Sequence, residues 1–72
     1  MAYLIQFKSD LTKGKWISKK GLYSTKSSIE EMLKYLRKFH TNNKYSKKIN
    51  LVERAKKVDA HKSPYNRMRY VS

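Results

Sequence analysis

Cysteine is absent from this 72-residue sequence, which excludes disulfide bonds, thiolate metal sites and thiol catalysis. Long apolar runs are absent as well, because no stretch approaches the ~20 residues that a membrane span needs. No basic residues precede the short apolar run at the N-terminus, as they would in a secretory signal. We therefore expect a cytoplasmic protein without a membrane partner. A chain of this length forms one domain that buries only about 60% of its unfolded surface.

Groups that support catalysis or metal binding are also few. Of the five acidic residues, Glu30 and Glu31 have the spacing that caps a helix start, and the others are scattered along the chain. His40 lies on the apolar side of an expected helix, where packing is favoured over chemistry, and His61 lies in a polar segment. The two glycines are isolated, so there is no phosphate-binding loop. The sequence therefore predicts neither an enzyme nor a cofactor or metal site.

The scarcity of acids leaves a large excess of positive charge. Lys and Arg total 18 against five Asp and Glu, for a formal net charge of +13. Codon usage in an AT-rich genome adds lysine, and there are 14 lysines to four arginines, but it does not remove acids. The imbalance therefore favours an anionic partner, of which nucleic acid is the commonest.

The N-terminal segment has the pattern of a β-hairpin. Residues 2–8 alternate, with Tyr3, Ile5 and Phe7 on one side, as expected of a strand that packs on both faces. Residues 15–18 form a second short strand after a loop of turn-forming residues. We expect these two strands to pair antiparallel.

Residues 28–40 have the strongest helical pattern in the chain. Ser27 and Ser28 are suitable N-caps, and each has a glutamate three residues later, at Glu30 and Glu31. Apolar and partly apolar residues recur at helical spacing and predict one buried side. They are Ile29, Met32, Leu33, Leu36 and His40.

Residues 46–57 fit two structures. Alternation of apolar and polar residues favours a strand, whereas Asn50 and Glu53 could form the capping box of a helix. We favour the strand, because a hairpin and one helix need a third strand for a stable sheet. The expected fold is an α+β, ββαβ domain over residues 1–59, with a three-stranded antiparallel sheet and one helix packed on one face. A basic C-terminal tail, residues 60–72, follows, and its order is left open.

Cations cluster around the second and third strands and in the tail, with aromatic residues between them. Trp16, beside Lys15 and Lys19, is a candidate for stacking on a base or contacting a partner, whereas Phe7 and Phe39 are assigned to the core. Because lysine dominates, we expect contacts to backbone phosphates with little sequence readout, on DNA or RNA. The candidate nucleic-acid-binding residues are Lys13, Lys15, Trp16, Lys19, Lys20, Lys47, Lys48, Arg54, Lys56, Lys57, Arg67 and Arg69.

Three short motifs follow one another along these elements: Gly14-Lys15-Trp16, Tyr23-Ser24-Thr25 and Val52-Glu53-Arg54. Their order over residues 3–54 resembles small uncharacterised proteins encoded by phages and prophages of Gram-positive bacteria. The resemblance implies a ββαβ domain in the host cytoplasm, with a role in phage takeover or phage DNA metabolism. It also implies an alternative function, in which the basic and aromatic surface inhibits an acidic host protein. Whether the domain is a monomer or a homodimer is left open.

Overall fold

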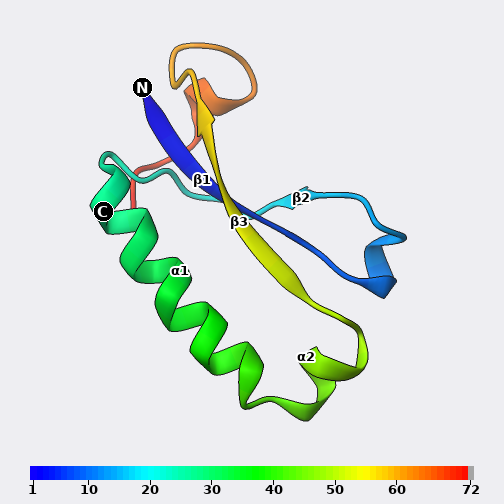
Figure 1. Ribbon diagram of the computed structural model, residues 1–72. Helices are drawn as coiled ribbons and strands as arrows, with labels where there is room; N and C mark the ends of the chain where they lie inside the picture. Colours follow the sequence, from blue (N-terminus) through cyan, green and yellow to red (C-terminus); the bar gives the residue numbers. More distant parts are fainter. Residues whose placement is uncertain (72) are drawn as a thin grey trace.

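The alternating N-terminal residues form the central strand of the sheet. In the computed structural model, which describes residues 1–71, β1 spans Ala2–Lys8, β2 spans Ile17–Ser18 and β3 spans Val52–Val58. The strand order is β2-β1-β3, and both pairings are antiparallel. One long helix, α1, runs beside this sheet (Figure 1). The predicted α+β fold, with a three-stranded antiparallel sheet and one main helix, is confirmed, although β2 is shorter than predicted.

The two faces of β1 pack against different parts of the chain. Ile5 packs with Ile29 and Leu33 of α1, so the odd-numbered residues of β1 face the helix. Leu4 packs with Leu22 on the opposite face, which we call the far side of the sheet. Because directly paired residues of antiparallel strands share a face, the register assigns each residue of β3 to one side. The far-side positions of the two long strands are Ala2, Leu4, Gln6, Lys8, Val52, Arg54, Lys56 and Val58.

The helix begins earlier than the sequence predicts. It spans Lys26–Thr41, and its N-cap is Thr25, whose Oγ1 accepts a hydrogen bond from the Ser28 backbone N–H at 3.2 Å. The prediction that Ser27 or Ser28 caps the helix is therefore wrong, and the two glutamates fall beyond the first turn. Threonine is among the residues favoured at N-caps, and the earlier start adds two residues, about half a turn, to the beginning of the helix.

The predicted apolar stripe of α1 is mostly confirmed. Ile29 and Leu33 are buried, and Met32 and Leu36 pack partly against the same cluster. Phe39 is 55% exposed, so its assignment to the core is wrong. It lies at the edge of the stripe, and the cluster between α1 and the sheet extends along the helix only as far as Leu36.

The segment after α1 is part helix and part strand. A short helix, α2, spans Lys44–Lys48, so the prediction of a continuous strand over residues 46–57 is wrong in its first part. The side chain of Asn43 caps α2 by accepting a hydrogen bond from the backbone N–H of Ser46 at 3.0 Å. Asn50 then adopts a positive φ of 53°, and β3 begins two residues later.

Residues 60–71 fold back against the sheet. They pack against the buried far-side residues through Ala60, Tyr65 and Met68. The backbone N–H and C=O of Leu22 both bond to this segment, at N···O distances of 2.9 and 2.8 Å. The segment is therefore attached to the domain at several points, whereas residues 61–64 are exposed. The last residue of the expected tail, Ser72, lies outside the described residues.

Candidate nucleic-acid interface

The far side of the sheet changes character along its length. Around Leu4 and Val58 it is apolar and is covered by the C-terminal segment. From Gln6 onward it carries polar, basic and aromatic side chains. Since α1 packs on the opposite face, it does not cover this half. This part of the sheet is the strongest candidate for a contact surface.

A row of hydrogen bonds crosses all three strands in this half. The side-chain amide of Gln6 donates to the hydroxyl of Ser18 on β2 at 3.1 Å. The Arg54 Nε on β3 donates to the Gln6 side-chain oxygen at 3.0 Å. Gln6 is buried with its amide satisfied on both sides, so it holds the Arg54 side chain in one place against the sheet.

Trp16 lies beside this row and contacts two cations. It directly precedes β2, and continuing the register of that strand sets it opposite Lys8. The Arg54 guanidinium carbon is 4.0 Å from the centroid of the Trp16 ring, and the Lys8 Nζ is 4.8 Å from it. Each such contact stabilises the pair by about 0.5–1 kcal/mol at an exposed site. The ring is partly exposed, and it is framed by positive charge.

These side chains form one basic group on the sheet. We call the following six residues the far-side cluster: Gln6, Lys8, Trp16, Ser18, Arg54 and Lys56. Lys56 joins it by register, two residues along β3 from Arg54. No far-side position of β1 or β3 is acidic, and within residues 1–71 none of the three cations forms an ion pair. Because like charges held together repel each other, binding of an anion would relieve that repulsion.

Only three of the predicted binding residues, Trp16, Arg54 and Lys56, belong to this cluster. Lys57 alternates with Lys56 and lies on the helix side of the sheet, opposite Tyr3. Lys19 also lies apart, lining a cavity between the sheet and α1.

Lys47 and Lys48 were expected on the third strand, and this placement is wrong. They lie in the last turn of α2, because the Asn43 cap makes that segment helical. They are exposed there, away from the strands of the sheet.

The remaining predicted cations flank the sheet. Lys13 and Lys15 lie in the loop between β1 and β2, next to Trp16 in the sequence. Lys20, Arg67 and Arg69 line one shallow cavity where the C-terminal segment meets the sheet. They form a second basic group beside the far-side cluster.

Three members of the cluster were not predicted: Gln6, Lys8 and Ser18. Gln6 and Lys8 lie on the first strand, whose alternation already assigned them to one face. Their contact with Arg54 depends on the pairing of β1 with β3, and these strands are separated by more than 40 residues. The alternation of β1 could have identified Lys8 as a far-side residue, but only the register between the strands identifies the residues that it contacts.

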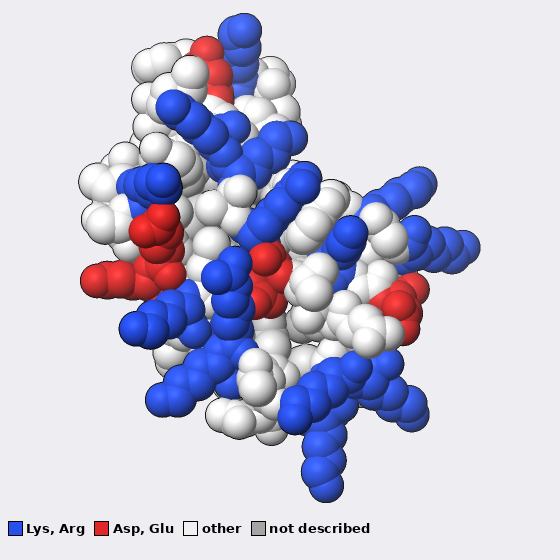
Figure 2. Space-filling model, in the orientation of Figure 1, with Lys and Arg blue, Asp and Glu red and all other residues white. Residues whose placement is uncertain are grey.

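Positive charge is not confined to the far-side cluster. Figure 2 shows Lys and Arg side chains spread over the whole visible face, with small groups of acidic side chains between them. Charge alone therefore does not identify the contact surface. The distinguishing feature of the far-side cluster is the aromatic ring held among cations.

Glu53 forms the other polar centre of the domain, on the helix side. Its carboxylate is hydrogen-bonded to His40 Nδ1 at 2.9 Å and lies 3.5 Å from Arg37 Nε. The Glu53 side chain is only 6% exposed, and it joins β3 to α1. His40 thus has a structural partner. Among residues 1–71, no three His, Asp or Glu side chains are grouped to hold a metal ion.

No family model, curated protein or solved structure matches this chain. In the described part of the chain, no helix is both long and apolar enough to cross a bilayer.

Proposed function

We propose that the chain is a small nucleic-acid-binding protein that uses the far-side cluster as its contact surface. Lys8, Arg54 and Lys56 bind backbone phosphates, and Trp16 stacks with a base. The flanking lysines of the β1–β2 loop extend the phosphate contact. The role is binding without catalysis, in the cytoplasm.

The observation that carries this proposal is the Trp16 ring, framed by two cations on a sheet face that the helix leaves uncovered. Proteins that bind single strands combine a positively charged surface with aromatic rings on which bases stack. Arg54 already has its Nε bonded to Gln6, which leaves its terminal nitrogens for a phosphate.

The same geometry predicts weak sequence specificity. Two of the three cations are lysines, which contact phosphates as point charges and do not read base edges. Arg54 is the single bidentate group of the cluster. We therefore expect affinity to depend on strand type and salt far more than on sequence.

The direct test is fluorescence anisotropy with labelled single-stranded DNA, single-stranded RNA and duplex DNA at low and moderate salt. We expect binding that weakens steeply as salt rises. Trp16→Leu should weaken single-strand binding about five- to 150-fold, since stacking of one base contributes about 1–3 kcal/mol. Tyr45→Leu is the matched control, because Tyr45 is an exposed aromatic residue on α2, outside the cluster.

Two results would reject the proposal. One is that none of the three polymers binds at low salt. The other is that Trp16→Leu and Tyr45→Leu bind alike, which would mean that the ring makes no contact.

The alternative function, binding to an acidic protein, is favoured by a different feature. A cavity lies on the helix side of the sheet, away from the far-side cluster. Its lining is mainly apolar, which suits a protein side chain better than a phosphate.

A further inference from the structure

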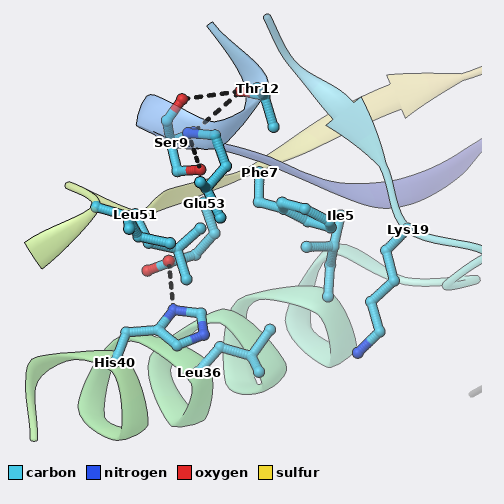
Figure 3. A pocket seen from close by; sticks show the side chains of 11 residues that line it. Ile5, Phe7, Ser9, Thr12, Lys19, Leu36, His40, Leu51 and Glu53 are labelled. Atoms are coloured by element: carbon cyan, nitrogen blue, oxygen red, sulfur yellow. Dashed lines mark hydrogen bonds and ion pairs between the residues drawn. The ribbon is translucent and has the colours of Figure 1, made fainter. Parts of the chain in front are cut away.

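An apolar cleft opens between the sheet and the C-terminal half of α1. Its volume is about 510 Å³. Figure 3 shows Ile5 and Phe7 of β1 facing Leu36 and His40 of α1 across it, with Lys19 at one side. Leu11, Ile49 and Leu51 complete most of the wall. The volume is in the range that accepts a large apolar group.

Apart from Lys19 at its side, the polar side chains that line the cleft already have partners. Glu53 is bonded to His40 and pairs with Arg37. The Ser9 hydroxyl accepts from the Leu11 backbone N–H, and the Thr12 hydroxyl donates to the Ser9 carbonyl. The cleft therefore offers an occupant mainly apolar contact.

Apolar surface continues outside the cleft. Leu11, on its wall, is 65% exposed. Ile17 pairs with Phe7 on the same side of the sheet and is 44% exposed. Phe39, next to His40 on α1, is exposed as well. An apolar surface that extends beyond its cavity is typical of a protein contact.

The charge near the cleft indicates the chemistry of the occupant. Lys19 lines the cleft, and Lys13 and Lys15 lie in the adjoining loop. None of these three lysines forms an ion pair within residues 1–71. A second copy would bring another formal charge of +13 to this surface, which disfavours self-association. An acidic segment is the complementary partner.

We infer that this cleft binds an acidic segment of a partner protein, which inserts a large apolar side chain between β1 and α1. The flanking carboxylates of that segment pair with the three lysines beside the cleft. The apolar contacts of this site lie on the opposite face of the sheet from the far-side cluster, and the two proposed sites share only the lysines of the β1–β2 loop.

The test is to select binders from a displayed random peptide library on the folded protein, then to measure synthetic copies by anisotropy. We expect peptides in which a large apolar residue is flanked by Asp or Glu. Leu11→Gln should weaken their binding about tenfold and Ile17→Thr about fivefold, because each change removes apolar surface that the peptide would cover. Both side chains are exposed, so neither change removes buried core.

Val52→Thr is the matched control, because Val52 is also a 44% exposed strand residue but lies on the far side. It should leave peptide binding unchanged, as should Trp16→Leu.

The inference is overturned if no peptide is selected, if the selected peptides are acidic without an apolar residue, or if the cleft variants bind like the control. A dimer that buries the cleft, seen by sedimentation, would also overturn it. So would loss of nucleic-acid binding in Leu11→Gln and Ile17→Thr, which would assign the cleft to that polymer.

Discussion

Met68→Ala tests whether the C-terminal segment is part of the folded domain. Met68 packs on the buried far-side residues that include Leu4 and Leu22. Truncating a buried methionine costs about 2–5 kcal/mol, and Met68 is only partly buried, so we expect a decrease in stability of about 1–2 kcal/mol. A 72-residue domain has a free energy of unfolding of about 4–11 kcal/mol, so the decrease is measurable.

Urea unfolding followed by circular dichroism measures this decrease. With a denaturant slope of about 1 kcal/mol per molar, the midpoint should fall by about 1–2 M. Arg67→Ala is the control, because Arg67 is exposed in the same segment, and its removal should change stability by no more than about 0.5 kcal/mol. If both variants unfold at the same urea concentration, the packing of this segment on the sheet is refuted.

Two further predictions concern single side chains, and the same urea assay checks both. Gly21→Ala should lower the free energy of unfolding by on the order of 1–3 kcal/mol, because Gly21 has a φ of +117° and an added Cβ would lie 2.9 Å from Val71 Cγ1. A urea midpoint equal to that of the wild type would contradict this prediction. His40→Ala should cost about 3 kcal/mol, because it leaves the buried Glu53 carboxylate with only Arg37, whose side chain is 60% exposed. Arg37→Ala should lower the free energy of unfolding by no more than about 1 kcal/mol. Equal decreases for His40→Ala and Arg37→Ala would show that the hydrogen bond to His40 does not stabilise Glu53 more than the ion pair with Arg37 does.

The sequence predicts the parts of this fold that local periodicity determines. The alternation in Ala2–Lys8 indicated both the strand and its two faces, because each face is buried against a different apolar partner. The spacing of Ile29, Leu33 and Leu36 indicated the buried side of the helix, because that side packs on one layer of the sheet.

Features that depend on single caps or long-range pairing could not be predicted in this way. Thr25 and Asn43 act as caps through one hydrogen bond each, and several neighbouring residues could have done the same. The far-side cluster needs the register between Gln6 and Arg54, which are 48 residues apart in the sequence. Trp16 and Arg54 could therefore be named as separate candidates, but their contact could not be foreseen.

If nucleic acid contacts one defined surface, its affinity depends on which positive charges are removed and not only on how many. Two triple variants that each remove three positive charges test this dependence. Lys8→Gln, Arg54→Gln and Lys56→Gln together change the far-side cluster. The control carries glutamine in place of three exposed lysines on the two helices, at Lys34, Lys38 and Lys44.

The measurement is the slope of log affinity against log salt concentration on duplex DNA. Each phosphate contact contributes about 0.9 to the magnitude of this slope, so removing three phosphate-binding side chains should lower it by about 2.7. We expect that decrease in the far-side variant and a slope close to wild type in the helix variant. Equal decreases in the two variants would contradict the account, because binding would then follow net charge and not the surface around Trp16.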